Sequence, residues 1–284
     1  MPSNARERSA VEFLVVGDEL LNGTTVDTNS SWLSKELVKL GAIVTRKITV
    51  SDDLAEISGA FKLALKRKPA WIFSLGGLGP TFDDKTIEGL ALALGRKLKR
   101  NGSAVRMLKE SYKRRPEDLG VAKGKLAKSS LKMAYLPEGA KPLKNPVGTA
   151  PGVICTQKAT QIVALPGVPK EMKAIFFEQL VPLIKRNLPQ FKEMEQWMKV
   201  VGVGEPRITP YLSKIMKEYS PEIYIKSHAM GFRKGRSVLK IQLIATGPPE
   251  LSNVVREKLM SATREMKDTA LKLGGEFSRI WLVP

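Results

Sequence analysis

The first half of the chain alternates between short apolar runs and longer stretches in which apolar residues have helical spacing. Val11–Val16 and Ala70–Leu75 are apolar runs without regular alternation, which is typical of strands buried on both faces of a parallel sheet. Between and after them, three sets of apolar residues recur three or four positions apart: Leu33, Leu37 and Leu40; Leu54, Ile57, Phe61 and Leu65; Ile87, Leu90, Ala91 and Leu94. Alternating strands and amphipathic helices predict βαβ units, and therefore a three-layer α/β/α domain with a mostly parallel sheet.

Turn and capping residues predict where these elements end. Gly41 is expected to close the first helix before a strand at Ala42–Val50, and Ser51 and Asp52 to cap the next helix. Further along, the pattern predicts two basic helices, a hairpin and a helix beginning near Pro169, in this order: Ser103–Arg115, Leu119–Lys132, Val153–Thr156 paired with Gln161–Leu165, and Pro169–Leu180.

The pattern breaks near Pro189, which predicts an N-terminal domain at residues 1–188 and a small domain at residues 189–284. The small domain has the order strand, helix, strand, strand, helix, a βαββα unit with both helices on one face of a sheet. It resembles KH-type modules, but Gly202-Val-Gly-Glu205 lacks their Gly-x-x-Gly clamp for RNA. We therefore expect no specific nucleic acid as a partner.

Composition narrows the classes of function. The net charge of +19 favours acidic partners, and residues 96–144 carry +11 of it, with fifteen Lys or Arg against four acids. Such a patch either steers a phosphorylated ligand or is a solvated surface. One cysteine and one histidine exclude an intramolecular disulfide and a Cys/His zinc site. No apolar run is long enough to span a bilayer and Met1–Ala10 lacks a signal peptide's apolar stretch, so we expect a cytoplasmic protein without membrane contact.

The loop from Gly76 to Thr86 is the strongest candidate for chemistry, because it joins a strand to a helix. Its glycines allow a bound group to approach the backbone N–H donors, and a helix N-terminus favours an anion such as phosphate. Asp83 and Asp84 add oxygen ligands of the kind that Mg²⁺ takes alongside phosphates. In the alternative interpretation, one of these aspartates caps the helix and the glycines only make a tight turn.

Two other polar motifs follow apolar strands in the same way. Asp18-Glu19 comes after the first strand and Pro166-Gly167 after the second strand of the hairpin. Open α/β sheets bind ligands at the carboxyl ends of their strands, so these motifs are predicted to converge with the Gly76 loop on one ligand site. Asp18 or Glu19 is the candidate to orient or deprotonate water there.

Four blocks of sequence resemble one family. They are Gly17-Asp-Glu-Leu-Leu-Asn-Gly23 with Asp27-Thr-Asn29, Gly76-Gly-Leu-Gly-Pro-Thr-Phe-Asp-Asp-Lys-Thr86, Asn145-Pro-Val-Gly-Thr-Ala-Pro-Gly152, and Leu165-Pro-Gly-Val-Pro-Lys-Glu-Met172. Together they are similar to the CinA-like, competence-damage-inducible protein family and its molybdopterin-binding domain, over about residues 11–187. Full-length bacterial members also carry a nicotinamide-mononucleotide deamidase domain; we expect none here and do not transfer that activity.

The resemblance implies a fold shared with the enzymes that adenylate molybdopterin and insert molybdenum. In the CinA-like branch it also implies metal-dependent pyrophosphatase activity on ADP-ribose, or on FAD in eukaryotic relatives. By position, Asp84, Thr86 and Glu88 match the Asp-x-Thr-x-Glu of the adenylyltransferases, and Asp83 extends the acid pair as in the CinA-like branch. The resulting site has catalytic Asp83, Asp84, Asp18 and Glu19, metal ligands Asp83 and Asp84, and ligand contacts Gly76, Gly77, Gly79, Thr81, Thr86, Asp27, Asn29, Gly167 and Glu171.

Three functional hypotheses follow. The first is a nucleotide pyrophosphatase that uses Mg²⁺, Mn²⁺ or Co²⁺ on ADP-ribose-like or dinucleotide substrates, since a metal held by carboxylates neutralises a P–O–P group and positions water. The second is a non-catalytic protein that binds molybdopterin or a nucleotide. The third is an RNA-binding protein that uses the basic patch. The resemblance also implies a homo-oligomer, either a dimer or a trimer.

Overall fold

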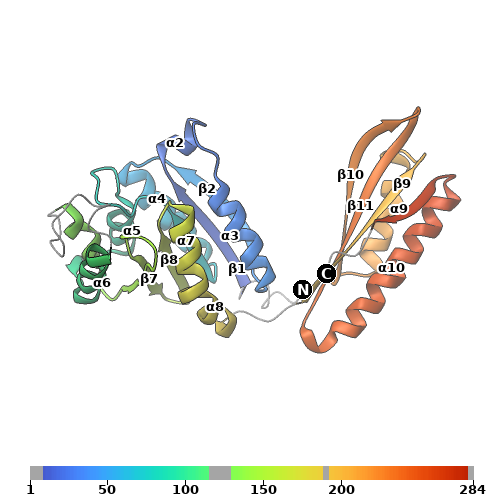
Figure 1. Cartoon of the computed structure of the whole chain (residues 1–284). Helices are drawn as coiled ribbons and strands as arrows, with labels where there is room; N and C mark the ends of the chain where they lie inside the picture. The colour runs from blue at the N-terminus through green and yellow to red at the C-terminus, as the bar shows by residue number, and fades with distance from the viewer. Residues whose placement is uncertain (1–8, 115–128, 188–191, 281–284) are drawn as a thin grey trace. The chain divides into compact units, whose positions relative to one another are not determined.

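The structure is a computed structural model that describes residues 9–114, 129–187 and 192–280. The chain divides into two compact units between Pro189 and Gln190, and each unit is described by itself below. Figure 1 labels the helices and strands of both.

The N-terminal unit is built on one six-stranded sheet in the order β2-β1-β3-β8-β7-β6. The strands are β1 (Ala10–Val16), β2 (Ile43–Val50), β3 (Trp71–Leu75), β6 (Lys141–Leu143), β7 (Gly152–Gln157) and β8 (Thr160–Leu165). β2, β1, β3 and β8 are parallel, whereas β7 and β6 are antiparallel to their neighbours. The predicted mostly parallel sheet and the predicted hairpin are therefore confirmed.

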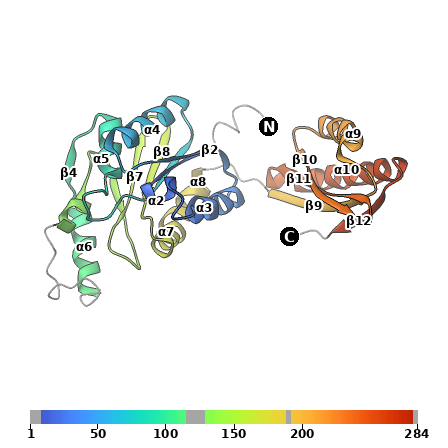
Figure 2. The same ribbon diagram turned by 90° about the horizontal axis from the view of Figure 1, so that it is seen from above.

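Helices cover both faces of this sheet (Figure 2). One face packs against α4 (Leu54–Arg67), α5 (Thr86–Leu94) and α6 (Gly102–Arg114), and the other against α3 (Thr28–Lys39), α7 (Pro169–Ile175), the π-helical turn η2 (Phe176–Leu180) and α8 (Val181–Asn187). Alternate residues of β1 enter the two cores: Leu14 and Val16 face α4, and Phe13 and Val15 face α3. The prediction of three layers is confirmed, since the apolar runs are buried on both sides.

A buried ion pair explains the one charged residue in the first strand. Glu12 is 4% exposed, and its carboxylate accepts two hydrogen bonds from Arg67 at the end of α4. The Arg67 Nε to Glu12 Oε1 distance is 2.7 Å. This paired geometry compensates for burying the charge. The register of β1 against β2 shifts between Val11 and Glu12.

One predicted helix end was wrong. Asp53, not Ser51 or Asp52, caps α4, because its carboxylate accepts from the backbone N–H groups of Ala55 and Glu56. The closure of α3 by Gly41 is confirmed, since Gly41 follows the C-cap Leu40 with a φ of 89° and donates its N–H to the Val38 carbonyl at 2.9 Å. The Asp52 side chain does not cap α4, and its carboxylate accepts a hydrogen bond from the Asp18 backbone N–H instead.

The remaining elements of this unit are short. They are α2 (Asp18–Leu21), β4 (Leu98–Arg100), β5 (Tyr135–Pro137) and the 3₁₀ helix η1 (Ser129–Ala134). The second predicted basic helix, Leu119–Lys132, lies mostly outside the described residues. Its described end is not α-helical but belongs to η1.

The C-terminal unit has one more strand than predicted. Its elements are β9 (Lys192–Val201), α9 (Glu205–Glu218), β10 (Ile223–Arg233), β11 (Arg236–Gly247), the 3₁₀ turn η3 (Pro249–Leu251), α10 (Ser252–Lys272) and β12 (Glu276–Ile280). The antiparallel sheet has the order β10-β11-β9-β12. The predicted βαββα unit is therefore corrected to βαββαβ, the ferredoxin-like arrangement. β12 was missed because Glu276-Phe-Ser-Arg-Ile280 has no apolar run, and only its pairing with β9 defines it.

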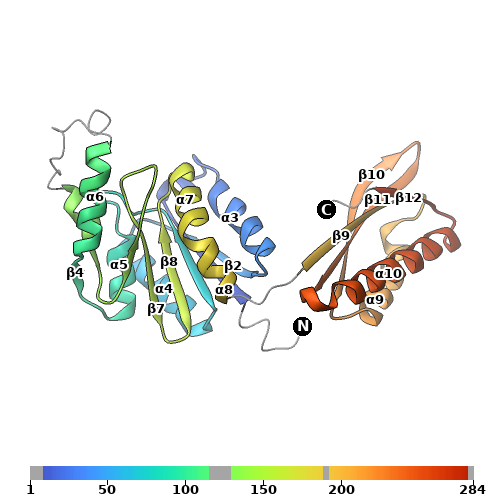
Figure 3. The same ribbon diagram turned by 60° about the horizontal axis from the view of Figure 1, so that its bottom comes forward.

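Both helices of this unit lie on one face of its sheet, as predicted (Figure 3). Ile208 and Leu212 of α9 and Leu259 and Met266 of α10 share a core with alternate residues of the strands. No helix in the described parts of either unit is long and apolar enough to cross a membrane.

The contact between α4 and α5 allows a test of the packing. A Cβ on Gly89 would lie 2.5 Å from Ile57 Cγ2, whereas one on Gly59 would have no neighbour within 4 Å. We predict that Gly89→Ala lowers the free energy of unfolding by about 1–3 kcal/mol through overpacking. Gly59→Ala, in α4, should raise it by up to about 1 kcal/mol, because alanine favours helix. Urea unfolding of both variants measures this; equal effects would contradict the packing.

Candidate ligand pocket at the ends of the parallel strands

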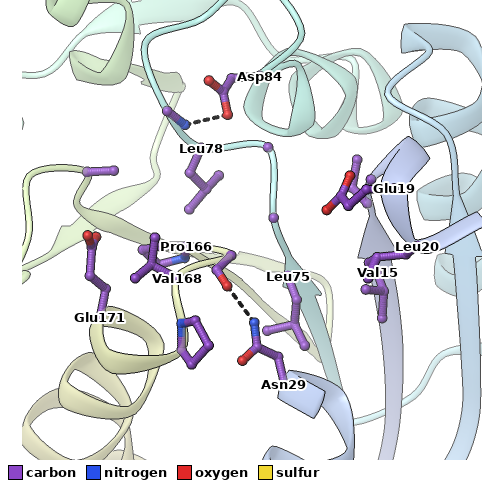
Figure 4. Close-up of a pocket in the computed structure, with 18 of the residues that line it drawn as sticks. Val15, Glu19, Leu20, Asn29, Leu75, Leu78, Asp84, Pro166, Val168 and Glu171 are labelled. Atoms are coloured by element: carbon purple, nitrogen blue, oxygen red, sulfur yellow. Dashed lines mark hydrogen bonds between the residues drawn. The ribbon is translucent and has the colours of Figure 1, made fainter. Parts of the chain in front are cut away.

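A cavity of about 610 Å³ lies at the carboxyl ends of β1, β3 and β8. Its size is within the range of small-molecule sites, roughly 300–1,000 Å³. Figure 4 shows Glu19 and Glu171 on opposite sides of it. Ten of the thirteen predicted site residues line the cavity: Glu19, Asp27, Asn29, Gly76, Gly77, Gly79, Asp83, Asp84, Gly167 and Glu171. Asp18, Thr81 and Thr86 do not line it.

The glycine loop needs glycine at its first two positions. Gly76 and Gly77 have φ angles of 97° and 65°, a region that other residues rarely adopt. A Cβ on Gly76 would lie 2.4 Å from the carbonyl oxygen of Val16, and one on Gly77 would lie 2.3 Å from Thr86 Oγ1. The backbone therefore passes closer to its neighbours than any side chain permits.

Two backbone donors of this loop are free. The Gly76 N–H is bonded to the Leu165 carbonyl at 3.0 Å, which ties the loop to β8. Among the described residues, the N–H groups of Gly77 and Leu78 have no protein acceptor, and both residues line the cavity. Unpaired N–H groups in such a loop are suited to an anion.

Asp84 organises the loop from within. Its carboxylate accepts from the N–H groups of Gly79 at 2.7 Å and Thr81 at 2.8 Å, and from the Thr81 hydroxyl. The first of these bonds is drawn in Figure 4. Lys85 is the N-cap of α5 and makes no side-chain capping bond. Neither aspartate caps the helix, so the capping interpretation of this pair was wrong.

Thr86 and Thr81 also bond within the loop. Thr86 is fully buried, and its hydroxyl donates to the Gly76 carbonyl at 2.8 Å. Thr81 donates its hydroxyl to Asp83 and Asp84. These two residues hold the loop in shape and do not face the cavity, unlike the direct contacts predicted for them.

One wall of the cavity is acidic. Asp52 from the β2–α4 turn lies beside Glu19, and its carboxylate accepts from the Asp18 backbone N–H at 2.9 Å. Burial, more than the neighbouring carboxylates of Asp18, Glu19 and Asp83, raises the pKa of Asp52 above its ordinary value. Sequence analysis treated Asp52 as a helix cap; only the pairing of β1 with β2 brings it to the site.

The pKa of Asp83 shifts in the opposite direction to that of Asp52. A hydrogen bond from the Thr81 hydroxyl, its own backbone N–H, and the charges of Lys132 and Lys85 lower the pKa of this exposed carboxyl. Lys132 of η1 also donates to the Thr81 carbonyl at 2.5 Å. Lys132 was not predicted as a site residue, because in the sequence it is only one of the many basic residues of segment 96–144.

The predicted metal ligands do not form a preformed site. In the parts of the chain that the structure describes, no three His, Cys, Asp or Glu side chains are grouped so that they could hold a metal ion. Asp84 is already committed to the loop. A metal ion here would take part of its coordination from ligand phosphates and water.

The opposite wall is held by amide side chains. Asn29 Nδ2 donates to the Gly167 carbonyl at 2.6 Å, joining α3 to the turn after β8 (Figure 4). Asn145, which is 3% exposed, donates to Glu171 Oε2 at 2.6 Å and accepts from the Gly148 N–H at 2.8 Å. Asn145 was part of a matching block, but its spacing gave no reason to place it against Glu171.

Asp27 lines the cavity as a helix cap. It is the N-cap of α3, and its carboxylate accepts from the Ser30 N–H at 2.9 Å and from the Ser30 hydroxyl. Lys47 donates to the Ser30 carbonyl at 3.1 Å, beside the same cap. Asp27 therefore fixes the end of α3 from which Asn29 reaches Gly167.

The comparisons with known proteins agree with this arrangement. Residues 12–186 match the family described as "Probable molybdopterin binding domain". The chain belongs to this family. A structure titled as the protein CinA with unknown function, from Thermoplasma acidophilum, is 40% identical with a TM-score of 0.55, over 62% of this chain and 98% of that chain. The resemblance to the CinA-like family and its molybdopterin-binding domain is confirmed.

Relatives also extend over both units. A protein of Sulfolobus acidocaldarius is 38% identical over 95% of this chain and 97% of its own length. A protein of Saccharolobus islandicus is 40% identical over 93% of this chain and 95% of its own length.

A structure titled as the tungsten cofactor synthesizing protein MoaB of Pyrococcus furiosus is 18% identical with a TM-score of 0.41, over 63% of this chain and 96% of that chain.

The loop geometry of the molybdopterin-binding domain predicts different roles for its two aspartates. Asp84→Asn should lower the free energy of unfolding by about 1–2 kcal/mol, because an amide NH₂ would face one of the two N–H donors. Asp83→Asn should lower the melting temperature less than Asp84→Asn, because the Asp83 carboxylate is exposed and solvent screens its contacts. Thermal unfolding without ligand measures both. Equal melting temperatures for the two variants would show that Asp84 does not organise the loop.

The raised pKa of Asp52 predicts that its carboxylate destabilises the folded protein at neutral pH but not at low pH. Below pH 3.8, its ordinary value, the carboxyl is protonated in the folded and unfolded states alike and costs nothing. As pH rises through the higher folded pKa, the folded protein loses stability. Asp52→Asn should therefore raise the melting temperature at pH 7 and leave it unchanged near pH 3. A gain of the same size at both pH values would show that charge is not its cause.

Proposed function

We propose that the molybdopterin-binding domain binds a phosphorylated nucleotide in this pocket and hydrolyses its pyrophosphate bond with the help of a divalent metal ion. The proposal rests on two features that lie in the same cavity, backbone N–H donors and carboxylates. Free N–H groups at Gly77 and Leu78 are suited to phosphate, and the nearby carboxylates of Glu19, Asp52 and Asp83 are suited to a cation.

The donor set fits a hard metal ion. The ionisable side chains of the acidic wall are carboxylates, which Mg²⁺ and Mn²⁺ prefer. Asp83 would be one ligand, since its lowered pKa keeps it ionised, and Asp52 or Glu19 another. When bound, the metal would supply charge neutralisation at the pyrophosphate oxygens.

The residues of the chain supply binding and proton transfer. The N–H groups of Gly77 and Leu78 bind one phosphate and orient the P–O–P bond. Glu19 or Asp52 accepts the proton of the attacking water, and burial makes Asp52 a stronger base than an ordinary aspartate by raising its pKa. Asp18 serves this role less well than predicted, because it does not line the cavity. It holds Asp52 through its backbone N–H.

A second candidate function is binding without catalysis. In this reading the pocket holds molybdopterin or a nucleotide as a ligand only. The hydrogen bonds of Asp84 favour it, because this predicted metal ligand already holds the N–H groups of Gly79 and Thr81. A dimer or trimer remains part of either proposal.

Product analysis separates the two candidates. The purified chain is incubated with ADP-ribose, FAD or NAD in the presence of Mg²⁺, Mn²⁺ or Co²⁺. We expect ADP-ribose to give AMP and ribose 5-phosphate by addition of water across the P–O–P bond. Asp83→Asn should lower turnover by at least about a hundredfold, as is typical when charge stabilisation of the transition state is lost.

Glu56→Gln is the matched control, because this exposed acid in the first turn of α4 does not line the cavity. It should retain full turnover. Calorimetric binding of ADP-ribose without turnover of any substrate would leave the binding function in place and reject catalysis. Full turnover in Asp83→Asn would reject the assignment of the metal to this wall.

A further inference from the structure

The C-terminal sheet has one face that no described helix covers. α9 and α10 pack on the face that carries Met198, Leu239 and Ile241. Strand pairing places the alternate residues together on the other side. This open sheet face includes Tyr224, Lys226 and His228 of β10, Val238, Lys240, Gln242 and Ile244 of β11, Glu195, Trp197, Lys199 and Val201 of β9, and Glu276 and Ser278 of β12.

Two partly buried rings stack on each other at the centre of this face. The rings of Trp197 and His228 are stacked with centroids 5.3 Å apart and an angle of 29° between their planes. Trp197 pairs with Gln242 and His228 with Lys240, so the rings meet above the central strand β11. The Trp197 Nε1–H donates to Glu195 at 3.0 Å, which fixes the indole in its plane. Tyr224, 55% exposed, adds a third ring at the edge.

Lysines surround the rings. Lys199, Lys226 and Lys240 come from three adjacent strands, and within the described residues none of them forms an ion pair. Glu276 pairs with Arg236, and the Glu195 carboxylate, which accepts from the neutral Trp197 N–H, offsets only one of the three lysine charges. The uncompensated charge of the platform is positive. The hairpin that joins β10 to β11 continues this composition with Phe232, 80% exposed, followed by Arg233 and Lys234.

From this geometry we propose that the open sheet face binds single-stranded nucleic acid. Bases stack on the Trp197–His228 platform and phosphates contact the unpaired lysines. Stacking tolerates any base, because every base has a flat face, and it requires strands whose bases are not already stacked in a duplex. A protein partner would need acidic side chains opposite three lysines together with a flat apolar centre. A single strand supplies both features in every nucleotide.

This proposal refines the expectation of no specific nucleic acid. That expectation rested on the missing Gly-x-x-Gly clamp, which is a local sequence motif. The platform is assembled across strands, from Trp197 on β9 and His228 on β10. Because its contacts do not read base edges, binding should be independent of sequence and weaken steeply with salt.

Fluorescence anisotropy of labelled single strands tests the proposal with the full chain. Oligo-dT and oligo-U of about 15 nucleotides cover a stacking site of this kind. We expect dissociation constants near micromolar at about 0.15 M salt and much weaker binding to a duplex of the same length. Trp197→Ala should weaken binding about tenfold. Trp197→Phe, which keeps a ring, should remain within about threefold of the wild type.

Charge reversals distinguish this face from other basic surfaces. Lys226→Glu should weaken binding severalfold and reduce the slope of log Kd against log salt by about one. Lys214→Glu on α9 and Lys109→Glu on α6 are matched controls, since both lysines are exposed and lie on helices. Both should change affinity less than Lys226→Glu does. Circular dichroism and melting temperatures confirm that each variant is folded.

Several outcomes would overturn the proposal. One is the absence of binding even at low salt, including the case in which the chain self-associates and leaves no face for the strand. Others are equal affinity for single strands and duplex, or unchanged affinity in both Trp197→Ala and Lys226→Glu. A loss caused by Lys109→Glu but not by Lys226→Glu would assign the binding to the basic segment of the N-terminal unit instead.

Discussion

The close approach of three strand ends is the constraint on which the N-terminal pocket depends. A Cβ on Gly76 would collide with the Val16 carbonyl at the end of β1, and the Gly76 N–H is bonded to Leu165 at the end of β8. Gly167, after β8, has the Gly76 Cα 3.5 Å from where its own Cβ would be. With no side chains between them, the three backbones meet. The loop can therefore leave β3 with its next N–H groups unpaired, and acidic and amide side chains surround them.

Three aspartates of the pocket differ in hydrogen bonding and exposure because their surroundings differ. Asp84 has its oxygens turned to loop N–H groups, Asp83 is exposed and stabilised as an anion, and Asp52 is partly buried near like charges. Asp84 thus holds the loop through hydrogen bonds, Asp83 provides a carboxylate that stays charged, and Asp52 provides a carboxylate that binds a proton more readily than an ordinary aspartate. Hydrogen bonding and desolvation produce the difference, since they act in opposite directions on a carboxylate.

The two units expose different parts of their sheets. A parallel sheet is covered by helices on both faces, because each crossover places a helix on one side, so the strand ends are left for ligands. The antiparallel sheet of the C-terminal unit has both helices on one face, and its other face is left for contact. The first geometry leaves a pocket at the strand ends, and the second leaves one exposed sheet face.

The amino-acid sequence alone determined the long strands and helices of the N-terminal unit but not the short α2, β4 and β6, because only buried strands and amphipathic helices of several turns leave periodic patterns of apolar residues. It also identified the glycine loop, and most of the predicted site residues line the pocket, since βα loops follow strand ends in any parallel sheet. The tertiary structure decided what depends on contacts between distant segments. Asp52, Asn145 and Lys132 enter the site only when β2, the segment before β7, and η1 pack around it. In the same way, β12 exists by pairing with β9, and the Trp197–His228 platform forms across β11. No local pattern encodes such cross-strand neighbours, because their positions follow from strand order and register.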